Sequence, residues 1–170
     1  MERQKTTLAA YNELYKEQDD LYRGAARGFG LSDCAFWVLY ALRETKRPMT
    51  QSGICAAVYQ PKQTVHSALK KLEGEGYLRL AEGRDRRSKH LVLTERGEAL
   101  VRRTVDPVMA AEEAAMDTLT EAEQAQLLAL CRRYNAALRQ YLPRRGSGKR
   151  EQNEEQTDEN ENTAIRSLYL

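Results

Sequence analysis

Residues 61–97 read PKQTVHSALKKLEGEGYLRLAEGRDRRSKHLVLTERG, and this stretch decides the fold. It opens with Pro61, whose fixed φ suits the first turn of a helix, and its apolar residues recur at helical spacing as far as about Glu73. Two short β-strands, 77–80 and 90–93, then flank a charged loop. The stretch therefore predicts a helix followed by a β-hairpin with a basic tip.

A shorter helix precedes this stretch. Thr50 is a favourable N-cap for a helix that ends near Val58, and a break at Tyr59 separates it from the next helix. Two short helices joined by a tight turn predict a helix-turn-helix. Farther upstream, Ser32 is the expected N-cap of a helix whose apolar run at 36–40 predicts that it is largely buried.

Long amphipathic helices lie on both sides of the helix-turn-helix. The first spans about 7–27, and two more follow the hairpin within 95–142, the last one starting at a capping box formed by Thr120 and Glu123. The apolar stripes of these helices include Tyr11, Leu14, Leu21, Leu127, Tyr134 and Leu138. Because such stripes are unfavourable in water, we expect 7–27 and 95–142 to be the dimerisation helices of a homodimer.

The composition favours one compact domain that is mainly α, with a small β-hairpin wing. Of the 170 residues, 41% are hydrophobic and 31% are charged, and only four are Pro. The charged start of the sequence holds no signal-peptide core, and no apolar run is long enough to span a bilayer. We therefore expect a cytoplasmic protein that does not engage a membrane.

Charge is distributed unevenly along the chain. Residues 151–170 hold six acidic residues and one basic residue, so the rest of the chain is basic although the net charge is only +2. A basic folded part favours a polyanionic partner, although many basic proteins never bind nucleic acid. The polar composition of 143–170 predicts a disordered acidic tail.

The cysteines show no pairing pattern. Cys34, Cys55 and Cys131 each lie in an apolar helical pattern, which predicts reduced thiols packed as small hydrophobic residues. Cys34 has a second interpretation, because its place near a helix N-terminus would lower its pKa and make it reactive. Its sequence neighbours offer no cation, so packing is the favoured interpretation.

Five segments match a known family in order and spacing. They are PMTQ at 48–51, PKQTV at 61–65, LKKLEGEGYL at 69–78, DRRS at 85–88 and LTERG at 93–97. Together they resemble the winged helix-turn-helix of MarR-family regulators over about residues 8–142, and the most specific part is the Asp-x-Arg loop followed by Leu-Thr-x-x-Gly. Two residues depart from the family pattern, since Gly53 replaces an acidic residue and Pro61 replaces a capping Ser.

The resemblance implies a domain of residues 1–142 with a DNA-binding lobe at 48–94. On the helix at 61–73, the polar side chains opposite the apolar stripe are those of Gln63, His66, Ser67 and Lys70. Side chains of these types suit base edges, while Lys62 and Thr64 near the helix start suit phosphates. The alternative is an ordinary solvated helix face.

The loop of the hairpin corresponds to a wing. It carries three arginines, which are Arg84, Arg86 and Arg87. A guanidinium group can enter a narrow minor groove, where the negative potential is enhanced, and we expect Arg87 to do so. The resemblance implies that Asp85 orients a neighbouring arginine by a carboxylate–guanidinium pair. The alternative is a soluble turn without a ligand.

The resemblance also implies a small-molecule effector of unknown identity, which binds in a cleft between the dimer region and the lobe. The candidate lining residues are Tyr11, Tyr15, Trp37 and Tyr40. The alternative is that they belong to the core, as aromatic residues at helical spacing more often do. One branch of the family senses peroxides through a cysteine, which is the reactive interpretation of Cys34.

These features predict a sequence-specific transcription regulator that binds double-stranded DNA, namely a ligand-responsive homodimeric repressor on a pseudo-palindromic operator. The alternative is a winged-helix module that binds protein instead of DNA. The sequence shows no catalytic motif, since His66 and His90 lie on the proposed DNA face and in a strand, and no P-loop, HExxH or GxSxG occurs. We therefore expect no enzymatic activity, no metal and no other cofactor.

Overall fold

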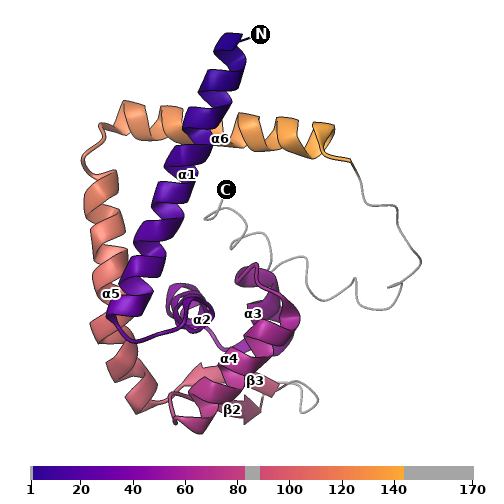
Figure 1. Ribbon diagram of the computed structural model, residues 1–170. Coiled ribbons are helices and arrows are strands. Elements are labelled where there is room, and N and C mark those ends of the chain that lie inside the picture. The colour runs from indigo at the N-terminus through magenta and orange to yellow at the C-terminus, as the bar shows by residue number, and fades with distance from the viewer. Residues whose placement is uncertain (1, 83–88, 144–170) are drawn as a thin grey trace.

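The computed structural model describes residues 2–82 and 89–143 of the chain (Figure 1). In chain order its elements are α1 (Glu2–Gly28), α2 (Asp33–Thr45), β1 (Met49–Thr50), α3 (Gln51–Ala57), α4 (Lys62–Gly74), β2 (Leu78–Glu82), β3 (Lys89–Leu93), α5 (Glu95–Met116) and α6 (Glu121–Tyr141). The three strands form one small antiparallel sheet. The predicted class, mainly α with a small β wing, is confirmed.

Helix α2 lies at the centre of the hydrophobic core. Its Phe36, Val38 and Leu39 side chains are completely buried, and the helix contacts α1, α3, α4 and α5. The Ala35 amide donates to the Ser32 hydroxyl at 3.2 Å, so Ser32 is the N-cap that the sequence predicts. Each such buried side chain contributes about 1.5–3 kcal/mol, which makes α2 the main support of the elements around it.

The wing sheet has one strand more than the sequence predicts. Strands β2 and β3 pair from Leu78 opposite Leu93 to Glu82 opposite Lys89, which confirms the hairpin and lengthens it. Strand β1 adds to the other edge of β3. A strand of two residues is too short to show alternation in a sequence, so the sequence does not predict it. The third strand joins the start of the helix-turn-helix to the wing.

The end of α4 leads directly into the wing. Gly76 has φ +75°, a left-handed conformation that glycine adopts without strain. The Tyr77 amide donates to the Leu72 carbonyl at 2.8 Å, and the Gly76 amide donates to the Glu73 carbonyl at 2.9 Å. This pair of bonds is a Schellman motif, and it stops the helix so that β2 begins two residues later.

The start of α5 is locked against the same turn. The Thr94 hydroxyl donates to the Gly76 carbonyl at 2.6 Å and accepts the Gly97 amide at 3.0 Å, while the Thr94 amide donates to the Tyr77 carbonyl at 3.0 Å. A Cβ atom at position 97 would overlap the Tyr77 carbonyl oxygen. Gly97 is therefore required for the close approach that sets the direction in which α5 leaves the lobe.

Helices α1, α5 and α6 extend away from the lobe. Figure 1 shows α5 running from the sheet to α6 and α1 crossing α6, and the Tyr11 and Tyr134 rings lie 5.0 Å apart between these two helices. The capping box at the start of α6 forms as predicted, with the Thr120 amide donating to Glu123 at 2.8 Å. Helix α1 begins at Glu2, earlier than the predicted start near residue 7, and no residue of α6 is buried.

The apolar stripes of these helices are exposed in the single chain. The exposed large side chains are Leu8, Tyr11, Leu14, Tyr15 and Leu21 on α1, Met116 on α5, and Leu127, Leu128, Leu130, Tyr134, Leu138 and Tyr141 on α6. Leu21 is 69% exposed. Contiguous apolar surface of this kind is unusual on a monomer and indicates an interaction face.

Candidate nucleic-acid interface

Helix α4 divides into a buried and an exposed face. The buried side chains, which pack toward α2 and α3, are Val65, Ala68, Leu69 and Leu72. The exposed side chains on the opposite face are Gln63, His66, Ser67 and Lys70. The arrangement leaves a row of hydrogen-bonding groups on the outside of a helix whose backbone is held firmly by the core.

The N-terminal end of α4 differs from the prediction in one respect. Pro61 is the N-cap and not a first-turn residue, with φ −53° and ψ 133°, and no side chain caps the helix there. Lys62 and Thr64 are exposed beside the backbone amides of the first turn. These amides have no partner within a helix, so together with Lys62 they favour an anion such as a phosphate.

The turn between α3 and α4 adds an aromatic side chain at the edge of this face. Tyr59 has φ +49°, and its side chain is 63% exposed. A left-handed backbone at a residue other than glycine costs about 1–3 kcal/mol and is often found at functional sites. The sequence indicates a break at Tyr59, but it gives no sign that the aromatic ring faces outward.

Two hydrogen bonds organise the exposed face of α4. Gln51 at the start of α3 places its Nε2 atom 3.0 Å from Nδ1 of His66. The Ser67 hydroxyl donates to the Gln63 carbonyl oxygen at 3.0 Å. Sequence reasoning did not find Gln51, because it lies 15 residues before His66 and only the packing of α3 on α4 brings the two together.

The wing strands are described up to the pairing of Glu82 with Lys89. Arg84, Asp85, Arg86 and Arg87 lie outside the described residues, so the roles expected for them stay predictions. Residues 144–170 of the predicted tail lie outside as well.

The aromatic residues predicted for an effector cleft divide between two places. The Trp37 and Tyr40 rings lie 5.3 Å apart on α2, and Tyr22 of α1 lies 5.1 Å from Trp37. Tyr11 instead packs against Tyr134 of α6, and Tyr15 is largely exposed. Tyr22 thus joins Trp37 and Tyr40 in one cluster, whereas Tyr11 and Tyr15 lie nearer the N-terminus of α1.

Glu112 connects the aromatic cluster on α1 and α2 to helix α5. The hydroxyls of Tyr22 and Tyr40 donate to its two carboxylate oxygens, each at 2.6 Å. Burial, assisted by the bond to Glu112, raises the pKa of Tyr22 to about 12. Burial and the charge of Glu112 raise the pKa of Glu44, whose Oε2 is buried and has no hydrogen-bond partner among the described residues. Helices α1, α2 and α5 therefore meet at one polar network.

A second link between α2 and α5 lies nearer the sheet. The Arg43 guanidinium donates to both carboxylate oxygens of Asp106, at 2.8 and 2.7 Å, and contacts Glu98 at 3.3 Å. The bond to Asp106 raises the pKa of Arg43. A hollow of about 290 Å³ adjoins Arg43, and its lining includes Lys46, Arg47 and part of β3. A bidentate pair between planar guanidinium and carboxylate groups fixes their relative geometry. Helices α2 and α5 are therefore held together at two places, by Arg43 with Asp106 and by Tyr40 with Glu112.

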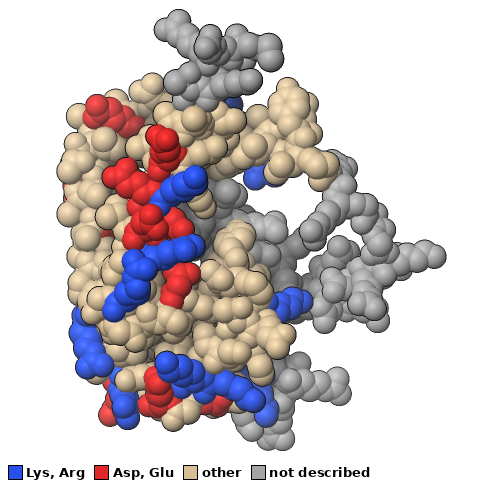
Figure 2. Space-filling view, viewed as in Figure 1, with Lys and Arg blue, Asp and Glu red and all other residues tan. Residues whose placement is uncertain are grey.

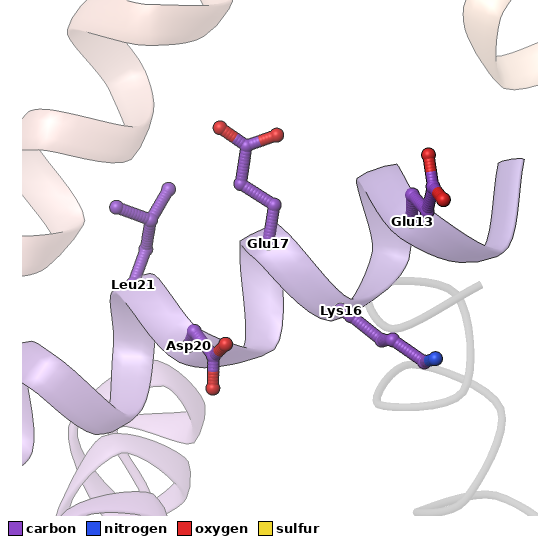
Figure 3. A pocket seen from close by; sticks show the side chains of 5 residues that line it. All are labelled: Glu13, Lys16, Glu17, Asp20 and Leu21. Atoms are coloured by element: carbon purple, nitrogen blue, oxygen red, sulfur yellow. The ribbon is translucent and has the colours of Figure 1, made fainter. Parts of the chain in front are cut away.

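The surface of α1 carries mixed charge. Figure 2 shows acidic and basic side chains alternating along this helix, and a hollow of about 470 Å³ lies beside it (Figure 3). The lining residues all belong to α1 and are Glu13, Lys16, Glu17, Asp20 and Leu21. Because a single helix lines the hollow, it is an open surface, and none of the predicted DNA-binding or effector residues takes part in it.

Cys34 is buried, and burial raises its pKa, with a further contribution from Asp33. Its burial agrees with the favoured interpretation, a thiol packed as a small hydrophobic residue, and the raised pKa argues against the second interpretation, a reactive thiol of lowered pKa. Within residues 2–82 and 89–143, no group of three or more His, Cys, Asp or Glu side chains is placed to hold a metal ion. None of the helices in this part of the chain has the length and apolar character needed to cross a membrane.

Comparison with known proteins gives matches to one family. A family model described as the MarR family matches residues 29–88. An uncharacterized HTH-type transcriptional regulator of Bacillus subtilis (strain 168), YwoH, is 40% identical over 70 residues, which are 41% of this chain and 50% of that protein. The match thus spans half the length of this relative.

Solved structures extend the likeness to the whole described fold. NMB1585, a MarR family regulator from Neisseria meningitidis, is 28% identical with a TM-score of 0.64, over 81% of this chain and 94% of that one. Sco3205, a MarR family transcriptional regulator from Streptomyces coelicolor solved in complex with DNA, is 22% identical with a TM-score of 0.65, over 81% and 89%. These proteins are regulators and not enzymes. The segment 29–88 matches the model of the MarR family, and the fold of the described residues is similar to that of MarR family winged helix-turn-helix regulators.

Proposed function

We propose that the chain is a cytoplasmic, homodimeric repressor that binds double-stranded DNA sequence-specifically and responds to a small molecule. The observation that carries the proposal is the division of α4 into a face buried in the core and a face of exposed polar side chains. A rigid helix with Gln, His, Ser and Lys on its outer face is suited to the major groove, where base edges offer distinct hydrogen-bonding patterns.

The exposed apolar stripes support a dimer. They lie on α1 and α6, away from α4, so a second copy can cover them without hiding the polar face. Two-fold symmetry then presents two copies of α4 to half-sites whose centres lie about 34 Å apart, one turn of DNA. The operator is accordingly expected to be pseudo-palindromic.

The network around Glu112 supports a response to a small molecule. It joins α1, α2 and α5 beside the Trp37 and Tyr40 rings, at the place where the long helices meet the lobe. A molecule that binds there and favours another arrangement of these helices changes the distance between the two α4 helices and so the affinity for the operator. The wing arginines, Arg84, Arg86 and Arg87, with Asp85 orienting one of them, supply minor-groove and phosphate contacts.

The test of base recognition starts with duplexes selected from a random library by the full chain. Gln63→Ala and Lys70→Ala should each lose about 1–3 kcal/mol of discrimination at one base position per half-site. Lys71→Ala is the matched control for Lys70→Ala, because it removes the same charge from the next position of α4. The Lys71 ammonium lies 3.9 Å from the Glu75 carboxylate. Loss of base preference in the control alone would contradict the assignment of the face.

The test of the wing uses Arg87→Ala and two salt concentrations. This variant should weaken binding to many sequences together and reduce the slope of log K against log salt by about one unit, because it removes one contact to the charged backbone. A native chain that selects no duplex and shows no salt-dependent DNA binding would favour the alternative, a winged-helix module that binds protein.

A further inference from the structure

The first residue of α3 contacts the exposed face of α4. Gln51 and His66 are both exposed, and Gln51 Nε2 lies 3.0 Å from His66 Nδ1. The position of Gln51 is itself fixed, because Thr50 caps α3 by accepting the Gly53 amide at 3.1 Å. The bond therefore connects two backbones that are held in place.

The chemistry of this bond determines where the imidazole proton lies. In the structure the amide nitrogen of Gln51 faces the ring, and because this nitrogen donates and does not accept, the arrangement assigns the accepting role to Nδ1 of His66. A neutral imidazole with an accepting Nδ1 carries its proton on Nε2, on the far side of the ring from Gln51. We propose that Gln51 is a positioning residue that holds His66 in the Nε2–H tautomer, so that α4 presents an N–H donor at position 66.

A fixed donor restricts what this position recognises. Resting on the proposed function of α4 in the major groove, His66 selects an acceptor, such as N7 of a purine, O6 of guanine or O4 of thymine, and rejects the amino groups of adenine and cytosine. Ser67 has the opposite polarity, because its hydrogen is used on the Gln63 carbonyl and its oxygen is left to accept. His66 is thus suited to hydrogen-bond acceptors on the DNA, and the adjacent Ser67 to donors.

The tautomer is measurable in the full-length protein without DNA. The sequence has two histidines, so nitrogen-15 spectra of the imidazoles contain two rings, and His66→Asn identifies the signals of His66. The native protein should show an unprotonated Nδ1 and a protonated Nε2. Gln51→Glu replaces the donor by a carboxylate that can only accept, so Nδ1 should become protonated. Gln51→Met removes the bond at similar length, and both tautomers should appear.

Ser52→Glu is the control for charge. It adds a carboxylate one residue along α3, where the side chain bonds Thr50 and not His66, so the tautomer should stay as in the native protein. The proposal is overturned if Gln51→Glu leaves Nδ1 unprotonated, or if Ser52→Glu shifts the proton as far as Gln51→Glu does.

The consequence for DNA is tested with the selected duplexes. Replacing purines one at a time by their 7-deaza forms removes single N7 acceptors, and the native protein should lose about fivefold in affinity at the position that His66 contacts, the value of about one hydrogen bond. His66→Phe, which has no N–H donor, and Gln51→Glu should be insensitive at that same position. The readout by His66 is overturned if no 7-deaza position that weakens the native protein becomes insensitive in these two variants. Failure to select any duplex would count against DNA binding, while the spectra would still decide the role of Gln51.

Discussion

Helices α4 and α6 both have an apolar stripe at helical spacing, but the stripe of α4 is buried and that of α6 is exposed. The apolar stripe of α4 is buried by the rest of the chain, and Val65 and Leu72 are 0% and 1% exposed. The stripe of α6 stays open, with Leu127, Leu130 and Leu138 between 36% and 45% exposed. Both stripes recur at helical spacing, so the pattern shows that a face needs cover and does not show which molecule supplies it.

The difference arises from where each helix is placed. α4 is short and follows α3 through a tight turn, so α2 and α3 lie within reach of its apolar face. α6 is carried away from the lobe by the 22 residues of α5. A helix at the end of such an arm finds little of its own chain to cover it, and in the proposed dimer the second copy does so.

The largest expected effect comes from placing a charge on each stripe. Leu72→Asp buries a carboxylate without a partner and should destabilise the lobe by about 4 kcal/mol or more, seen as loss of cooperative unfolding by circular dichroism. Leu130→Asp combined with Leu138→Asp should leave the lobe folded and give monomers or insoluble protein by light scattering. A well-folded, DNA-binding dimer of this double variant would refute the assignment of the dimer face.

A methyl group added to a glycine distinguishes the two regions with a smaller change. Gly97→Ala should cost about 3 kcal/mol of unfolding free energy in urea, because the new Cβ overlaps the Tyr77 carbonyl and α5 must move. Gly24→Ala on α1 is the control, since a Cβ there meets nothing within 4 Å. This control should be stabilised by about 0.5–1 kcal/mol through better helix propensity, and a similar loss in both variants would argue against the close approach.

Loss of the Glu112 hydrogen bonds that join α1, α2 and α5 should have a smaller effect on stability than the substitutions above. Glu112→Gln keeps the shape of the side chain but offers one acceptor to two tyrosine hydroxyls, which should cost about 1–2 kcal/mol in chemical denaturation. Glu113→Gln removes the same charge at the adjacent exposed position and should have almost no effect. Equal effects of the two substitutions would show that net charge matters and the tyrosine bonds do not.

Thiol labelling gives the finest comparison, because Cys34 and Cys55 lie on α2 and α3 and Cys131 lies on α6. The pKa of Cys34 is raised from 9.0 by burial, so its neutral form dominates below pH 9 and the thiol should stay unlabelled by iodoacetamide at pH 7. Its contribution to stability is complete below pH 9 and is lost only as the pH rises through the higher folded-state pKa. Cys131 on α6 is half-buried and should be labelled in dilute protein and protected as the dimer forms. Peptide mass spectrometry at two protein concentrations checks this, and equal labelling of Cys34 and Cys131 throughout would contradict the comparison.

Local signals in the sequence predicted the N-caps of α2, α3, α5 and α6 and the polar face of α4. Ser32, Thr50, Thr94 and Thr120 all cap helices as expected, because a cap depends on residues three positions away. The links that orient the helices could not be predicted in this way. Glu112 lies 90 residues from Tyr22, and only the packed core brings them together. For the same reason the sequence identified His66 as a candidate contact but not Gln51, which restrains it.

The short strand β1 has a consequence for the order in which the lobe folds. Its Met49 pairs with Leu91, 42 residues later, so α3, α4 and β2 lie on a loop that this pairing closes. Loop closure costs entropy that grows as about 1.5RT ln n, so the contacts within the loop should form first and β1 should join last. Thr50 is both the end of β1 and the cap of α3. We therefore expect the amides in the first turn of α3 to gain protection from hydrogen exchange later than those of α4.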